Sequence, residues 1–174
     1  KESVELEAKT VKDVVTQNKG ELKIAETDAE RDKIWSARRA ALPALAQLSP
    51  TTVLEDATVP RSRLTEMLLE VDNIARKYNL KIGTFGHAGD GNLHPTILAD
   101  ERNKEEMERV HKAVDEIFAV ALKLGGTLSG EHGIGMAKLR YLKDEIGESG
   151  IALMRTIKSA IDPKGIMNPG KLVP

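Results

Sequence analysis

Hydrophobic residues recur at helical spacing in three segments from the middle of the chain onward. The clearest is 103–124, where apolar side chains fall on one side of a helix that Gly125-Gly126 ends. A second apolar face runs from Ser62, a candidate N-cap, to about Asn79, and a third begins near Ser149 and ends before Asp162-Pro163. The pattern therefore predicts three amphipathic helices.

Two further helices are expected near the N-terminus. Val4, Ala8, Val11 and Val15 repeat at helical spacing, and Asn18-Lys19-Gly20 marks a stop. Thr27-Asp-Ala-Glu30 has the form of a capping box. It predicts a helix that carries Ile34, Trp35, Arg38 and Arg39 and that Pro43 limits.

Between the helices, short segments read as strands. These are 21–26, 51–59, 81–86, 92–98 and a short strand that runs into the glycine-rich loop of 127–135. The strands are partly polar, so we expect an α+β domain in which helices pack on one face of an antiparallel sheet. A ferredoxin-like double βαβ arrangement is the leading topology, and a small parallel sheet is the alternative.

Composition narrows the function classes. The 174 residues suit one domain, the formal net charge is -1, and only 3% of residues are aromatic. Nucleic-acid binding needs a basic field or stacking platforms, which this composition does not supply. Without cysteine the chain has no disulfide or thiolate chemistry. No apolar run approaches the roughly 18 residues of a membrane span.

The segment GHAGDGNLH, residues 86–94, places two of the four histidines around a glycine-rich turn. His87 and His94 lie on opposite arms of the predicted hairpin, where they can converge on a divalent metal. Taken alone, the pair is weak evidence for a metal site, because histidines that flank a turn are more commonly surface residues.

A second segment, SGEHGIG (129–135), places Glu131 and His132 side by side between glycines. Glu131 would complete a His–His–Glu ligand set with open coordination positions, and the adjacent His132 could then move a proton. The alternative is a solvated loop whose glycines only satisfy positive φ. The segment is not G-x-G-x-x-G, so it does not indicate a dinucleotide site.

Three other features carry less information on their own. Arg38 could clamp a carboxylate bidentately, although a surface arginine with a packed stem fits the pattern too. His111 lies on the charged face of its helix, where we expect solvent. Asn168-Pro-Gly-Lys171 reads as a terminal turn.

Taken together, GHAGDGNLH, SGEHGIG and NPGK, in this order and spacing, resemble the C-terminal part of the FAD-linked oxidases. These belong to the vanillyl-alcohol oxidase/p-cresol methylhydroxylase superfamily. WSAR (35–38) and EDATVPRSRL (55–64) also fit, and the match covers essentially the whole chain. The most similar members are the flavin subunit of glycolate oxidase and the D-lactate and D-2-hydroxyglutarate dehydrogenases.

The resemblance implies a role for each candidate residue. His87, His94 and Glu131 would bind a divalent metal, which is Zn, Mn or Fe in the family. His132 would be the general base, Arg38 would hold the substrate carboxylate, and Asn168 would lie in a tail (163–174) that folds toward the flavin. The implied reaction oxidises a 2-hydroxy acid to a 2-oxo acid with transfer of a hydride to FAD.

Two positions depart from the 2-hydroxyglutarate enzymes. Their substrate-contacting lysine and asparagine correspond here to Leu54 and Thr96. This departure argues against a dicarboxylate and favours glycolate or D-lactate.

The resemblance also implies an N-terminal FAD-binding domain that these 174 residues do not match. We therefore expect residues 1–174 to be the substrate (cap) domain of a larger oxidoreductase, with the first strand of the sheet preceding Lys1 and no activity in the isolated chain. The missing FAD domain and further oxidase or electron-transfer subunits are the expected partners. The expected location is cytoplasmic, with the inner membrane face reached only through partners.

Two alternatives stay open. One is a stand-alone metal-binding assembly module that pairs with a separate flavin subunit. The other is a metal-dependent hydrolase, which would leave Arg38 and the NPGK tail without a role.

Overall fold

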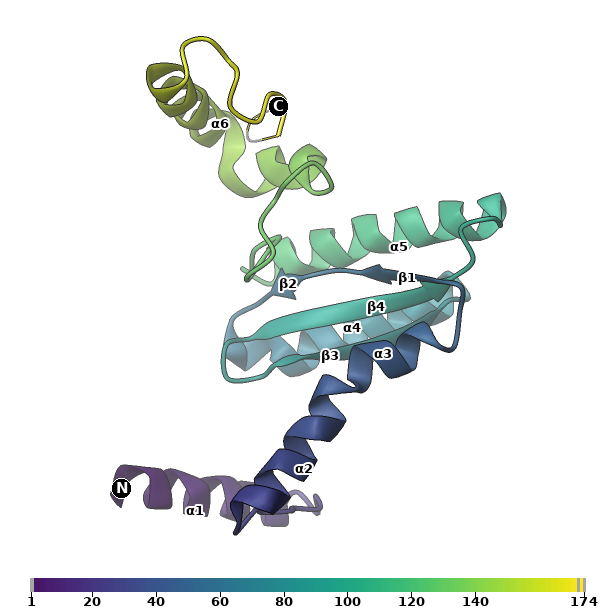
Figure 1. Cartoon of the computed structure of the whole chain (residues 1–174), viewed down its shortest axis with the longest axis vertical. Coiled ribbons are helices and arrows are strands. Elements are labelled where there is room, and N and C mark those ends of the chain that lie inside the picture. Colours follow the sequence, from purple (N-terminus) through teal and green to yellow (C-terminus); the bar gives the residue numbers. More distant parts are fainter. Residues whose placement is uncertain (1, 172, 174) are drawn as a thin grey trace. The chain divides into compact units, whose positions relative to one another are not determined.

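The computed structural model describes residues 2–171 and 173. The elements, in chain order, are α1 (Glu2–Gln17), α2 (Asp28–Arg39), α3 (Ala41–Ala46), β1 (Thr51–Leu54), β2 (Ala57–Thr58), the 3-10 turn η1 (Arg61–Arg63), α4 (Leu64–Lys77), β3 (Lys81–His87), β4 (Asn92–Ala99), α5 (Lys104–Lys123), the 3-10 turn η2 (Leu139–Tyr141) and α6 (Leu142–Ile161) (Figure 1). The chain divides into two compact units, residues 1–41 and 42–174.

The first unit consists of α1, α2 and the start of α3, and no residue of α1 or α2 is buried. The predicted capping box at the start of α2 is confirmed. Thr27 accepts a hydrogen bond from the backbone of Glu30, and the Glu30 side chain accepts one from the backbone of Thr27. The prediction of a strand over 21–26 is wrong, because this segment is an irregular connection without a strand partner.

The second unit contains an antiparallel sheet with β4 at its centre. β3 pairs with one edge of β4, and β1 and β2 pair with the other edge. The predicted strand over 51–59 is thus broken in two at Glu55-Asp56. The strand expected before the glycine-rich loop is reduced to a single antiparallel bridge between Thr58 and Thr127.

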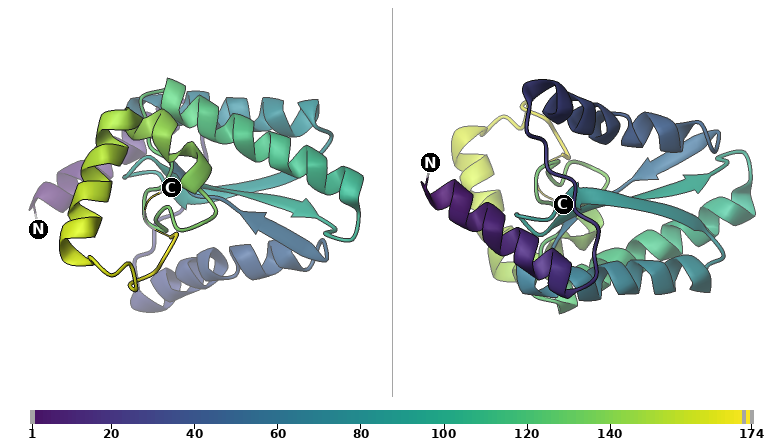
Figure 2. Two further views of the ribbon diagram at one scale, coloured as in Figure 1. Left: turned by 90° about the horizontal axis from the view of Figure 1, so that it is seen from above. Right: turned by 90° about the horizontal axis from the view of Figure 1, so that it is seen from below.

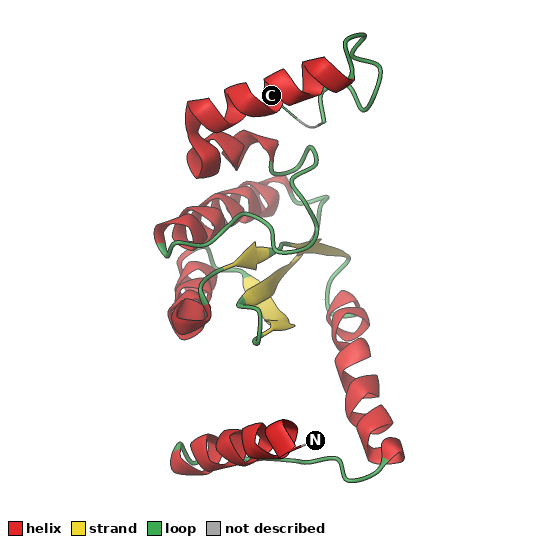
Figure 3. Ribbon diagram, turned by 90° about the vertical axis from the view of Figure 1, so that its left-hand side faces the viewer, coloured by secondary structure: helices red, strands yellow, loops and turns green. Residues whose placement is uncertain are grey.

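This order is that of the predicted ferredoxin-like βαββα arrangement, with the last strand reduced to one bridge. Every pairing is antiparallel, which excludes the alternative parallel sheet for the described residues. Helices α4 and α5 pack together on one face of the sheet, as expected (Figures 2 and 3).

The core lies between this pair of helices and the sheet. Its largest buried side chains include Met67 and Ile74 from α4, Ile97 from β4, and Ile117 and Phe118 from α5. Strand alternation turns every second residue of β4 toward this core and the residues between them toward the opposite face. That opposite face carries the candidate site.

Two helix starts differ from the sequence expectation. Helix α4 begins at Leu64, after η1, and Ser62 makes no capping hydrogen bond to it. Helix α6 begins at Leu142, seven residues before Ser149, but Gly147 interrupts it with a φ of 66°. The segment after this interruption corresponds to the predicted helix. No helix among the described residues is long and apolar enough to cross a membrane.

Candidate metal centre

The β3–β4 hairpin brings His87 and His94 to one face of the sheet. His87 is the last residue of β3 and pairs with Asn92, and His94 pairs with Phe85. Because cross-strand partners share a face, the two histidines are diagonal neighbours, and their ring centroids lie 5.6 Å apart. The turn closes through a hydrogen bond from the backbone N–H of Asp90 to the carbonyl of His87, 2.9 Å long.

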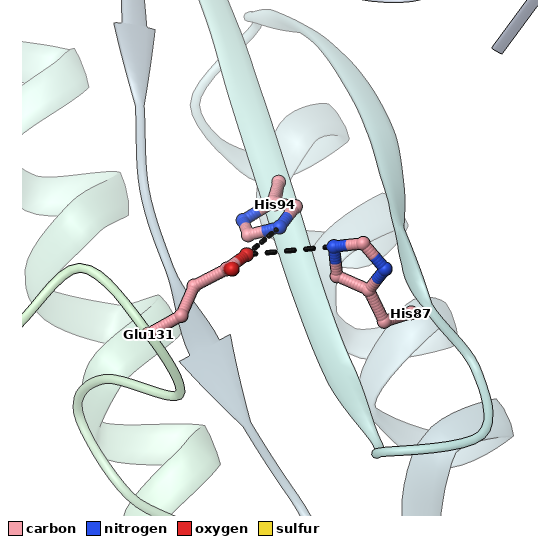
Figure 4. A group of neighbouring side chains, drawn as sticks. All are labelled: His87, His94 and Glu131. Atoms are coloured by element: carbon pink, nitrogen blue, oxygen red, sulfur yellow. Dashed lines mark ion pairs between the residues drawn. The ribbon is translucent and has the colours of Figure 1, made fainter. Parts of the chain in front are cut away.

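Glu131 reaches the two histidines from the loop that follows α5 (Figure 4). Its Oε1 lies 2.8 Å from Nε2 of His94 and 3.5 Å from Nε2 of His87. Glu131 follows His94 by 37 positions in the sequence, and the fold brings the two into one cluster, as expected from the two motifs.

His132 stands at the edge of this cluster. Its ring stacks on that of His94, with the centroids 5.1 Å apart and the planes at 10°, and its Nε2 lies 4.0 Å from Oε1 of Glu131. The side chains of His132, His87 and Glu131 are all about half exposed. A molecule from solvent therefore has access to the imidazole of His132 and to two of the predicted ligands, His87 and Glu131.

His94 differs from the other histidines because its side chain is almost completely buried, 4% exposed. Burial lowers the pKa of His94, and the nearby carboxylate of Glu131 opposes this shift without cancelling it. Its Nδ1 has no hydrogen-bond partner among the described residues, so the polar contacts of the ring are at Nε2. A neutral imidazole is the form that coordinates metals.

The three side chains are a suitable donor set for a divalent transition metal. One ligand atom from each of His87, His94 and Glu131 can be chosen so that all lie within 4.8 Å of one another. Two imidazoles and one carboxylate are the protein ligands of many catalytic zinc sites, in which a further position stays open for water or substrate. The arrangement fits a metal, and it does not distinguish Zn from Mn or Fe.

One residue of the site was not identified from the sequence. Asp56 lies at the break between β1 and β2, is fully buried, and accepts hydrogen bonds from the backbone of Glu131 and His132. Burial alone raises the pKa of an aspartate, but the hydrogen bonds from Ser129, His132, Asn92 and Glu131 outweigh it and hold the pKa of Asp56 well below its usual range. The sequence feature that could have identified Asp56 is an acidic residue inside a predicted strand, because a buried charge there needs partners.

Lys138 is the cation nearest to this buried carboxylate. Its Nζ lies 3.8 Å from Oδ2 of Asp56 and donates hydrogen bonds to the carbonyl oxygens of Asp56 and Leu128. Burial lowers the pKa of Lys138, while the charge of Asp56 opposes the shift. The two opposite charges reduce the cost of burying each other.

The remaining predicted site residues lie elsewhere in the chain. Arg38 is near the end of α2, in the first unit, and its proposed contact with substrate stays a prediction. Asn168 lies in the tail after α6, has a φ of 47° and borders a cavity of about 390 Å³ with Ile157, Ile161 and Met167. His111 is exposed on α5, as expected.

A smaller cavity of about 210 Å³ adjoins the candidate metal ligands. His87 and Glu131 line it together with Asp90, Asn92 and Thr58. Its polar lining and small size suit a small polar molecule that also touches the metal ligands.

Comparison with known proteins agrees with the family suggested by the motifs. Residues 1–172 match the model of the family "FAD linked oxidases, C-terminal domain". The chain is 55% identical over 148 residues to "Glycolate oxidase subunit GlcD" of Bacillus subtilis, covering 85% of the chain and 32% of that protein. It is 35% identical over 154 residues to the protein of the same name from Escherichia coli K12, covering 88% of the chain and 31% of the relative.

A third relative is "Probable D-lactate dehydrogenase, mitochondrial" of Danio rerio, 34% identical over 174 residues, covering 98% of the chain and 35% of that protein. The chain thus spans about a third of the length of these curated relatives. The match to the family model extends over nearly all of the chain, and it includes both strands of the histidine hairpin and the loop of Glu131. The chain therefore belongs to the FAD-linked oxidases and corresponds to their C-terminal domain.

Proposed function

We propose that this chain is the substrate- and metal-binding domain of an FAD-dependent 2-hydroxy-acid oxidoreductase. The observation that carries the proposal is the convergence of His87, His94 and Glu131, with His132 stacked beside them. Family membership supplies the flavin chemistry, and the site supplies the groups that would hold and deprotonate a small acid.

Each residue has a defined task in this reaction. His87, His94 and Glu131 hold the metal, which when bound contributes Lewis acidity toward the substrate oxygens. His132 accepts the proton of the C2 hydroxyl, since its half-exposed imidazole stands beside the proposed ligands and is open to the water that would take the proton away. The flavin, when bound, would supply the acceptor for the hydrogen on C2 as a hydride, and the product would be a 2-oxo acid.

Arg38 and Asn168 have the remaining proposed roles. Arg38 binds the substrate carboxylate bidentately and thereby orients C2 for hydride transfer. Asn168 lies in the tail, residues 163–174, that we propose to face the flavin. The FAD itself is bound mainly by a separate flavin domain or subunit, and electrons leave through further oxidase or electron-transfer partners.

The strand positions beside the histidines favour a short monocarboxylic substrate. Thr96 lies two residues after His94 on the same face of β4, and its partner across the strands is Leu54. Neither side chain is charged, so this part of the face offers no cation to a second carboxylate. Glycolate and D-lactate are therefore the proposed substrates, in agreement with the names of the relatives.

The proposal is tested by measuring bound metal. Purified without chelator, the parent chain is expected to contain near-stoichiometric Zn, Mn or Fe by elemental analysis, and a His87→Ala/His94→Ala variant is expected to contain none. His111→Ala, which removes an exposed histidine on α5, is the matched control and should keep the metal. Equal metal content in the parent and the double variant, or none in either, would refute the proposed centre.

A further inference from the structure

Asp56 is completely buried, and its carboxylate binds the backbone of the loop that carries Glu131 and His132. It lies where the strand pattern of 51–59 breaks, between β1 and β2. Its carboxylate oxygens accept hydrogen bonds from the backbone N–H groups of three consecutive residues, Gly130, Glu131 and His132, at 2.9–3.1 Å. These three N–H groups form a small anion-binding nest that the carboxylate fills.

The loop is tied to the same carboxylate by a side chain as well. The hydroxyl of Ser129 donates to Oδ2 of Asp56 over 2.5 Å and accepts a hydrogen bond from the backbone N–H of Gly133 over 2.7 Å. The segment 129–133 therefore closes around Asp56. Glu131 and His132 occupy two of the three positions whose backbone N–H groups bind Asp56.

The carboxylate also connects this loop to the histidine hairpin. Nδ2 of Asn92 donates to Oδ1 of Asp56 and to the hydroxyl of Thr58, and Asn92 is the strand partner of His87. The contact is close: a Cβ added at Gly130 would lie 2.3 Å from Nδ2 of Asn92. One carboxylate thus sets the distance between the loop and the hairpin.

The charge of Asp56 is compensated locally by Lys138. This lysine is only 5% exposed. It donates hydrogen bonds to the carbonyl oxygens of Asp56 and Leu128 and thereby joins the segments that contain these two residues. A neutral amide in place of Asp56 would present an NH₂ group to the N–H donors of the loop. It would also leave Lys138 as an uncompensated buried cation.

We infer that Asp56 is a positioning residue, which fixes the loop 129–133 so that Glu131 meets the two strand histidines and His132 stacks beside them. This inference rests on the proposed function, because it assumes that His87, His94 and Glu131 bind a metal. The physical reason is that groups hydrogen-bonded behind the direct ligands set the geometry of a metal site, and their loss weakens metal binding. Asp56 itself touches neither substrate nor metal.

The test compares Asp56→Asn with Glu145→Gln in the 174-residue chain. Glu145 is a matched control because its carboxylate also anchors backbone and hydroxyl groups, the N–H of Leu128 and the side chain of Thr127, just before the loop. Two properties are measured: hydrogen exchange of the amides in 129–133, and the affinity for Co²⁺ together with its visible absorption spectrum. Ser129→Ala, which leaves Asp56 in place and removes one donor, serves if Asp56→Asn does not fold.

We expect Asp56→Asn to accelerate exchange at Gly130–His132 selectively and to weaken Co²⁺ binding on the order of 10- to 100-fold, with an altered spectrum. Ser129→Ala should show the same changes to a smaller degree, and Glu145→Gln should keep the parent affinity and spectrum. The inference is overturned if amide exchange in 129–133 stays as slow in Asp56→Asn or Ser129→Ala as in the parent chain. It is also overturned if Glu145→Gln loses as much affinity for Co²⁺ as Asp56→Asn. A parent chain that binds no Co²⁺ refutes the proposed metal function, and loop exchange in the variants then decides the role of Asp56 by itself.

Discussion

At the scale of single residues, buried polar groups determine where the exposed ones can act. His94 and Asp56 are buried, whereas His87, Glu131 and His132 are about half exposed. Strand pairing holds His94, and His87 lies on the same hairpin. Hydrogen bonds hold Asp56, and the loop that carries Glu131 and His132 donates them. Rigid support of this kind is what a site needs to keep its geometry when substrate arrives.

The depressed pKa of Asp56 leads to a prediction about acid stability. Its pKa in the folded state lies below the value of about 3.9 for an unfolded aspartate, so its contribution is complete above that value and is lost as the pH falls below it. Asp56→Asn should therefore lower the free energy of unfolding by about 3 kcal/mol at neutral pH. The difference between parent and variant should shrink progressively in acid.

Urea unfolding of both proteins over a pH series measures this difference. Asp72→Asn, at an exposed position on α4, is the control and should change stability little at any pH. A deficit of Asp56→Asn that stays constant down to the most acidic pH would contradict the assignment.

Arg38 permits a second prediction at this scale. Lysine carries the same charge but cannot form the paired hydrogen bonds of a guanidinium with a carboxylate. In the complete oxidoreductase, Arg38→Lys should raise KM for the 2-hydroxy acid about tenfold or more, while the neighbouring Arg39→Lys should not. Steady-state kinetics with an artificial electron acceptor measure the effect, and equal KM values for the two variants would remove Arg38 from the proposed site.

At the scale of elements, the β3–β4 hairpin is the unit that places both histidines. Gly86 lies one residue before His87, where the strands approach so closely that an added Cβ would lie 2.2 Å from the carbonyl oxygen of Asn92. Gly89, in the turn of the same hairpin, has no atom within 4 Å of such a Cβ. Two glycines three residues apart thus have different physical roles.

This contrast predicts the effect of two alanine substitutions. Gly86→Ala should destabilise the chain by about 1–3 kcal/mol, because the strands must separate to admit the methyl group, and it should reduce metal content as His87 moves. Gly89→Ala should be tolerated. Thermal unfolding and elemental analysis of the two variants test this prediction. Equal stability of Gly86→Ala and Gly89→Ala would show that the hairpin adapts to the methyl group.

At the scale of the whole molecule, the hydrophobic core belongs to the second unit alone. Every buried residue among those described lies between Asp56 and Asp162, and the helices of the first unit bury none. The candidate metal ligands lie in the second unit too. We therefore expect residues 42–174 to carry the stability of the chain and the proposed metal centre.

A deletion tests this division. The segment 42–174 should unfold cooperatively, with a melting temperature within a few degrees of that of the whole chain, because it retains the complete core. It should also keep the metal, whereas any activity of the reconstituted oxidoreductase should be lost with Arg38. A segment 42–174 that does not fold would show that the first unit contributes to the core.

The sequence alone determined the elements with strong periodicity and the residues with distinctive chemistry. The apolar face of α5, the capping box of α2 and the hairpin strands follow from local spacing, and His87, His94 and Glu131 were recognisable because glycines surround them. Such features depend on neighbours in the sequence, so they can be read without the fold.

Tertiary structure alone decided what depends on contacts between distant residues. The segment 21–26 has the composition of a strand but finds no strand partner, and the strand after α5 is reduced to one bridge with Thr58. Asp56 could not be recognised as the support of Glu131 and His132, because its partners lie more than 70 residues further along the chain. The free energy of a buried charge is set by the groups that surround it, and only the folded chain brings those groups together.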